Sequence, residues 1–144
     1  MLIQEKVAQA VGVLKEQGID CWITFARESV INGDPILDLL IGSEVTWHTA
    51  VIITAAGEAC TICGEYDRRT IEDTGAYRQV IGFVKGIREP FLEVMGRIKP
   101  SSIAISRYSP KPLPSKRLPA SIASPICFCL TRVIDEDITL QPPL

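Results

Sequence analysis

The sequence predicts an α/β domain: a mixed β-sheet with a central hairpin and helices packed on it, followed by an irregular proline-rich tail. Three observations support this prediction. Segments with helical spacing of apolar residues alternate with short β-branched segments. Residues 47–67 hold two such β-branched runs joined by a short break at Gly57. Seven of the ten prolines lie beyond Ser106, where neither period persists.

The chain begins with a helix–strand unit. Apolar residues recur at helical spacing through residues 2–14, and Gly18 supplies a C-terminal stop. Cys21 to Phe25 then form a short apolar strand of the kind found inside an α/β sheet. After the polar loop ARESVINGD, Asp34 and Pro35 occupy the N-cap and first-turn positions of a short buried helix that ends at Gly42.

The hairpin follows this helix. Val51 to Ile53 and Thr61 to Cys63 are predicted to be buried strand segments, with the chain reversing at Gly57 and Glu58. DRRTIEDTG is predicted to be a short polar helix or turn ending at Gly75, and QVIGFV a strand.

The last elements of the domain are a helix and a strand. The helix begins near Pro90 and stops at Pro100, and the strand covers Ser102 to Ile105. We therefore assign residues 1–105 to the domain and residues 106–144 to a divergent tail, in which only Ile122 to Val133 is apolar enough to dock as an extra element.

Composition limits the function classes. The chain has 144 residues, 47% of them hydrophobic, and a net charge of −2, which fits one globular domain with a real core. It has no basic stripe with interleaved aromatic residues, so nucleic acid is not an expected partner. Glu5 and Lys6 interrupt the region where a signal peptide would be apolar, and no later run is long enough to cross a bilayer. We expect a cytoplasmic protein without a membrane partner.

The five cysteines are expected to be reduced thiols, because an odd number without an export signal does not suggest a disulfide framework. Cys60 and Cys63 have the spacing of a zinc or redox pair, which Cys127 and Cys129 could complete. Residues three apart in a strand point to opposite faces, however, so we expect Cys60 and Cys63 to be strand residues, at least one of them buried.

No catalytic motif is evident. There is no nucleophile elbow, Walker loop or dinucleotide fingerprint, and every imidazole-based mechanism would depend on the single histidine, His48. The acidic cluster of Glu65, Asp67, Glu72 and Asp73 is better explained as a solvent-facing helix start than as a cation site.

The order of several segments nevertheless resembles a known family. A helix ending in KEQG is followed by IDCWITFARES, DPILDLLIGSEVTWHTAVIIT, GEYD, IEDTGAY, FVKGIREP and KPSSIAI. This series, from Met1 to Ile105, resembles the N-terminal domain of the creatinase, prolidase and Xaa-Pro aminopeptidase family.

The resemblance implies a domain that does no chemistry alone. In such enzymes it precedes a larger pita-bread catalytic domain, helps to form the dimer and contributes one wall of the substrate site. It implies no cofactor in this chain, because the pair of divalent metal ions belongs to the catalytic domain of the peptidase members. The expected partners are a second copy of the chain or a pita-bread catalytic domain.

The resemblance also suggests candidate site residues. Trp47 and His48 precede the first hairpin strand, where relatives place side chains that reach toward the neighbouring subunit's substrate pocket. Arg27 and Glu28 follow the first strand at its carboxyl end, where open α/β sheets commonly bind ligands. The alternative is structural: Trp47 packs against the short helix, His48 lies on the surface, and Arg27 with Glu28 forms a solvated loop.

The family pattern ends after Ile105, where YSPKPLPSKRLPASIASPICFC follows. Our hypothesis is that a frameshift or truncation has replaced the usual continuation. We therefore expect a non-catalytic domain that contributes to dimerisation and to the substrate site of a catalytic domain absent from this chain. The alternatives are a stand-alone interaction module derived from that domain and, third, a small-molecule-binding protein that uses the loop after the first strand. Whether the parent substrate is a peptide or a creatine-like amidine stays open.

Overall fold

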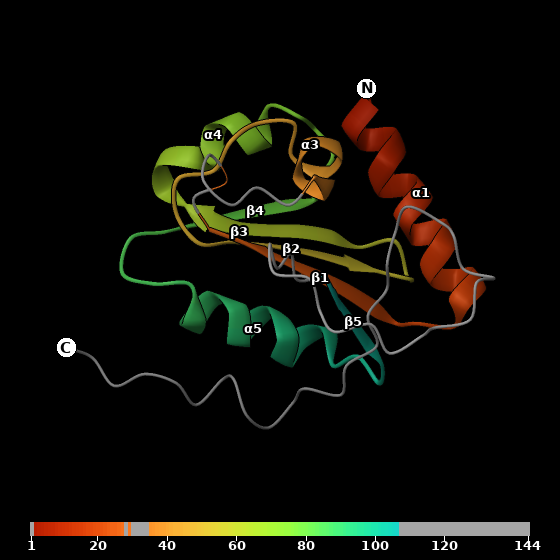
Figure 1. Cartoon of the computed structure of the whole chain (residues 1–144). Helices are drawn as coiled ribbons and strands as arrows, with labels where there is room; N and C mark the ends of the chain where they lie inside the picture. Colours follow the sequence, from red (N-terminus) through yellow and green to blue (C-terminus); the bar gives the residue numbers. More distant parts are fainter. Residues whose placement is uncertain (1, 28, 30–34, 107–144) are drawn as a thin grey trace, which may run out of the picture.

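A computed structural model describes residues 2–27, 29 and 35–106 of the chain. They form a three-layer arrangement in which a five-stranded sheet lies between helices on both faces (Figure 1). Helices α1 (Leu2–Gln17), α3 (Ile36–Leu40) and α4 (Glu65–Glu72) cover one face. Helix α5 (Arg88–Ile98) covers the other. The predicted α/β fold is confirmed.

The sheet is mixed, with the strand order β4-β3-β2-β1-β5. Its strands are β1 (Cys21–Ala26), β2 (Thr49–Thr54), β3 (Ala59–Gly64), β4 (Gln79–Phe83) and β5 (Ile103–Ser106). Strand β2 pairs antiparallel with β1 and β3, whereas β5 and β4 pair parallel with β1 and β3. Four strands therefore run in one direction and only β2 runs in the other.

The predicted hairpin lies at the centre of this sheet. All residues of β2 and β3 are buried. The turn between them uses Gly57 at a φ of 92°, a conformation that glycine adopts without strain. Glu58 donates its backbone N–H to the Thr54 side chain, which closes the turn. The hairpin strands are longer than their predicted apolar centres, because the flanking residues are buried as well: Thr49, Ala50 and Thr54 in β2, and Ala59, Cys60 and Gly64 in β3.

The sheet divides the core into two clusters. On one side, Val7, Ala10 and Leu14 of α1 pack with Leu37, Leu40 and Ile71 onto residues of the sheet such as Val51, Ile53 and Cys63. On the other side, α5 contributes Val94, with Phe91, Met95 and Ile98 packed beside it, against Ile23, Ile52 and Ile62. Both faces of β1, β2 and β3 are thus covered, as their continuous apolar character predicts.

The boundaries of some elements differ from the prediction. Helix α5 begins at Arg88, two residues before Pro90, because proline is tolerated in the first turn of a helix. It ends at Ile98, with Lys99 in a left-handed conformation directly before Pro100. Strand β5 is shifted one residue from the predicted Ser102 to Ile105. The predicted N-cap Asp34 and the tail from residue 107 onward, with its apolar segment, lie outside the described residues.

Backbone and side-chain contacts attach β5 to the start of β1. Asp20 accepts a hydrogen bond from the Ser101 N–H at 2.8 Å, and the Asp20 N–H donates to Ser102 Oγ at 2.9 Å. Asp20 is joined in this way to two serines that lie more than eighty positions later in the sequence. Strand β5 is consequently aligned with β1 from its first residue.

Candidate functional site

Most of the residues that the sequence suggests as site residues lie at one edge of the sheet. Because β1, β3, β4 and β5 run in the same direction, their carboxyl ends meet at this edge, together with the start of β2. The last residue of β1, Ala26, is paired with Thr49, the first residue of β2. Arg27 and His48 therefore follow one step beyond that pair, and Trp47 one step further. Glu28 lies outside the described residues.

Trp47 lies in an aromatic cluster at this edge. Its ring contacts Tyr66 edge-on, with ring centroids 5.7 Å apart, and Phe83 in a tilted arrangement at 5.9 Å. These partners belong to α4 and β4, not to the short helix α3. Tyr66 is 85% exposed, whereas Trp47 is half-buried. The cluster thus presents aromatic surface outward while the indole is fixed in position.

Gly64 makes the position of Trp47 possible. A Cβ atom at this last residue of β3 would come within 3.0 Å of both Cβ and Cε3 of Trp47. The tryptophan consequently packs directly over the backbone at the end of β3, and an added methyl group there would require the indole to shift by a few tenths of an ångström.

The loop before Trp47 is fixed by two sets of hydrogen bonds. Asp67, in the first turn of α4, accepts from the Thr46 N–H at 3.0 Å and from Thr46 Oγ1 at 3.4 Å. On the other side, the Val45 N–H donates to Ser29 Oγ at 2.8 Å, and the Ser29 N–H donates to the Val45 carbonyl at 3.1 Å. These bonds connect the loop to α4 and to the segment after β1. They limit the positions that Trp47 and His48 can take.

Of the acidic residues predicted to face solvent, Asp67 has this additional structural role. Glu65 and Glu72 lie on either side of Arg68, with N–O distances of 3.7 and 2.7 Å. These are half-exposed pairs, which contribute little to stability. In residues 2–27, 29 and 35–106, no three His, Cys, Asp or Glu side chains come together as a group that could hold a metal ion.

Cys60 and Cys63 point to opposite faces of β3, as strand geometry predicts. Cys60 belongs to the cluster under α5 and Cys63 to the cluster under α1, α3 and α4. Both thiols are free and buried. Burial raises the pKa of Cys60 to about 11 and that of Cys63 to about 12. The two thiols are therefore protonated at neutral pH. Because they lie on opposite faces of β3, they cannot bind the same zinc ion. Cys127 and Cys129 lie outside the described residues.

Two features that the sequence did not suggest lie elsewhere. The Tyr77 hydroxyl donates to the Leu40 carbonyl inside the core, and burial raises the pKa of that hydroxyl.

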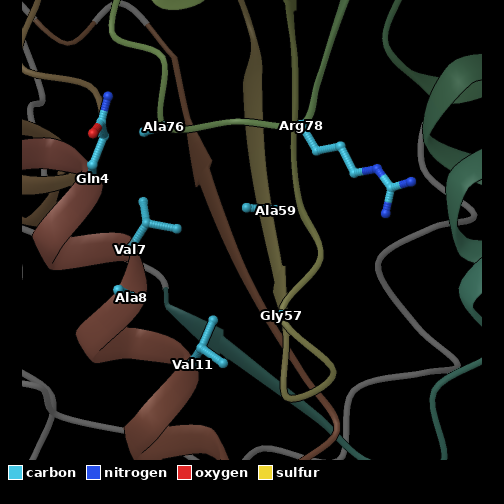
Figure 2. Close-up of a pocket in the computed structure, with 8 residues that line it drawn as sticks. All are labelled: Gln4, Val7, Ala8, Val11, Gly57, Ala59, Ala76 and Arg78. Carbon is cyan, nitrogen blue, oxygen red and sulfur yellow. The ribbon is translucent and has the colours of Figure 1, made fainter.

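At the opposite edge from Trp47, an open groove of ≈ 360 Å³ lies between α1 and the turn end of the hairpin (Figure 2). Its lining is mostly small and apolar, and the Arg78 side chain points away from α1. None of the predicted site residues lines this groove.

The fold is that of a known domain. The N-terminal domain of Xaa-Pro dipeptidase from Lactobacillus brevis superposes with a TM-score of 0.52 at 15% identity, over 69% of this chain and 75% of that one. This chain has the Xaa-Pro dipeptidase N-terminal-domain fold. Dipeptidase PepE from Mycobacterium ulcerans matches with a TM-score of 0.55 at 17% identity, and Xaa-Pro dipeptidase from Bacillus anthracis with 0.53 at 13%.

The Xaa-Pro dipeptidase N-terminal-domain fold accounts for only part of the larger proteins. The alignment covers 76% of this chain but 29% of the Mycobacterium ulcerans protein, and 70% of this chain but 26% of the Bacillus anthracis protein. At these identities the likeness is one of fold. The sequence matches no described protein family and no curated protein. None of the described helices combines the length and apolar character required to cross a bilayer.

Proposed function

We propose that this chain is a non-catalytic N-terminal domain of an Xaa-Pro peptidase or creatinase-like protein, which contributes to dimerisation and forms one wall of a substrate site. The catalytic domain is a separate part, and the pair of divalent metal ions belongs to it. The domain acts in the cytoplasm, a reducing compartment that suits the free thiols of Cys21, Cys60 and Cys63.

The observation that supports this proposal best is the aromatic cluster at the carboxyl-end edge of the sheet. Trp47 is held by Gly64 beneath it, by Tyr66 and Phe83 beside it, and by the loop that Asp67 fixes. A fixed indole with an exposed tyrosine next to it suits a wall that a substrate or a neighbouring subunit contacts. His48 and Arg27 add polar groups at the same edge.

The test begins with a search of the same genome for a catalytic domain that carries a two-metal donor set. This domain could be encoded beyond Ile105 in a neighbouring reading frame or by a separate gene. The purified chain is then mixed with that domain, and binding is measured by calorimetry. Hydrolysis of an Xaa-Pro dipeptide is followed with and without the chain. We expect no hydrolysis by the chain alone, and a lower KM of the catalytic domain when the chain is present.

Substitutions at Trp47 connect the effect to the proposed wall. Trp47→Ala should raise the KM of the mixture, because it removes a contact surface, while Trp47→Phe should retain most of the effect. If the chain neither binds the catalytic domain nor changes its KM, the accessory role is excluded and a stand-alone interaction module remains.

A further inference from the structure

In the part of the chain that the structure describes, the aromatic cluster of Trp47, Tyr66 and Phe83 keeps an exposed outer side. Tyr66 is 85% exposed, and Val84, which directly follows Phe83, is 72% exposed. They are the two most exposed of the large apolar side chains in this part of the chain. Because the ring contacts fix the Trp47 indole, a ligand that binds here would not have to order it first.

Carboxylates lie beside this cluster. A Cβ atom at Gly82 would overlap Glu65 Oε2, so the Glu65 carboxylate lies over β4, next to Phe83. The Glu65 side chain is half-exposed and can therefore meet a cation from outside. Helix α4 and its C-cap, residues 65–73, carry four carboxylates and two guanidinium groups. Aromatic rings beside an excess of negative charge suit a ligand that is both proline-rich and cationic.

The chain itself contains such a ligand directly after β5. Residues 107–119, RYSPKPLPSKRLP, hold four prolines, four cationic side chains and no acidic residue. Alternating prolines favour the extended polyproline II conformation, because each proline ring fixes its own φ. A segment of this kind loses little conformational entropy when it binds to aromatic side chains.

This segment also begins at the correct edge of the sheet. Strand β5 ends at Ser106, at the same edge as the ends of β3 and β4 where the cluster lies. The cluster is three to four strand spacings from β5. At about 4.8 Å per spacing this is about 14–19 Å, which about five to six residues span at about 3.1 Å each. Pro110 falls short of this distance, whereas Pro112 and Pro114 reach it.

We propose that the chain's own segment 107–119 binds across the aromatic cluster. Pro112 and Pro114 pack on the exposed rings of Trp47 and Tyr66, and the flanking lysines approach the carboxylates of α4. The connection to β5 makes the contact intramolecular, with an effective concentration on the order of 1 mM, so that a weak contact is sufficient. The segment then covers the surface that the proposed function assigns to the wall of a substrate site.

The contact lies within one chain and does not depend on the proposed function. If both hold, the segment and a catalytic domain compete for one surface, and releasing the segment should strengthen binding of that domain. A chain that makes the contact but binds no catalytic domain would contradict the proposed function alone. A chain that binds a catalytic domain without this contact would contradict the present proposal alone.

The test is a nuclear magnetic resonance measurement on the full chain. Nuclear Overhauser contacts should join the Trp47 ring to the ring protons of Pro112 and Pro114, and they should persist on dilution. Trp22, which is buried in the core, should show no contact with either proline. The absence of the Trp47 contacts would overturn the proposal. So would contacts that disappear on dilution, because these would come from the segment of a second copy.

Two sets of variants add a test by substitution. Pro112→Ala with Pro114→Ala should increase the quenching of tryptophan fluorescence by acrylamide, because Trp47 becomes more accessible. The matched control, Pro142→Ala with Pro143→Ala, changes two prolines outside the segment and should leave the quenching unchanged. Equal quenching of the two double variants would overturn the proposal.

The second set changes the aromatic surface. Tyr66→Ala removes an exposed ring, so the fold should be retained while the contacts between Trp47 and the two prolines are lost. Tyr66→Phe keeps the ring and should keep the contacts. A folded Tyr66→Ala variant with undiminished contacts would count against the proposal.

Discussion

The contact between Gly64 and Trp47 shows how one residue without a side chain decides the form of the candidate site. Gly64 has ordinary extended dihedral angles, φ −59° and ψ 145°, so its backbone would accept alanine. The obstacle is the 3.0 Å approach to the indole. The requirement for glycine is therefore steric and comes from a residue seventeen positions earlier.

Gly64→Ala should destabilise the domain by about 1–3 kcal/mol, because the added methyl group displaces a packed indole. Urea unfolding followed by tryptophan fluorescence measures this loss, and a red-shifted emission would report Trp47 moving into water. The control is Gly96→Ala in α5, where an added Cβ meets nothing within 4 Å. It should stabilise the helix by about 1 kcal/mol. Equal stability of the two variants would refute the argument.

Asp67 is the second residue on which the site depends. Asp67→Ala removes both hydrogen bonds to Thr46 and should cost about 1–3 kcal/mol, because one of them satisfies a backbone N–H. Asp73→Ala, at the C-cap of the same helix, removes a charge of the same sign and should be close to neutral. The comparison of the two unfolding curves separates the loop contact from a general charge effect.

At the scale of the elements, the buried thiols of β1 and β3 should make the domain less stable as the pH rises in the alkaline range. Burial raises the pKa of Cys60 from 9.0 to about 11. Below pH 9 the thiol is protonated in both states and has no effect. As the pH rises from 9 to about 11, only the unfolded chain loses the Cys60 proton. The free energy of unfolding therefore falls by up to about 1.4 kcal/mol per pH unit in this range.

Urea unfolding between neutral pH and pH 10.5 checks this expectation. Cys60→Ala should be less stable than the unchanged chain at neutral pH, because it leaves a small cavity, but its stability should fall less steeply with pH. The argument fails if the two slopes are the same.

Most elements could be predicted from the sequence because each depends on a local pattern. The hairpin follows from its β-branched runs and Gly57, and α1 from its apolar spacing. The strand order could not be predicted, since the pairing of β5 with β1 depends on contacts such as Asp20 with Ser102. The partners of Trp47 are similarly remote: Tyr66 and Phe83 meet it only because β3 and β4 end at the same edge. The sequence therefore indicated Trp47 as a candidate site residue, but not the side chains that fix its position.

At the scale of the whole molecule, the two core clusters share β1, β2 and β3, so they should unfold together. Leu14→Ala under α1 and Val94→Ala under α5 each remove a buried side chain. The leucine change should cost about 2–5 kcal/mol. In both variants, fluorescence and circular dichroism should report the same midpoint. Separate midpoints would mean that the two faces are independent units.

The position of α5 in the chain has a consequence for synthesis on the ribosome. One face of the sheet, with Ile23, Ile52 and Ile62, is covered by α5, whose residues are among the last of the domain to be translated. The hairpin and α1 leave the exit tunnel earlier. For that interval the nascent chain carries a bare apolar sheet face, and it is at this stage, before Ile98 has emerged, that the protein should depend most on chaperones.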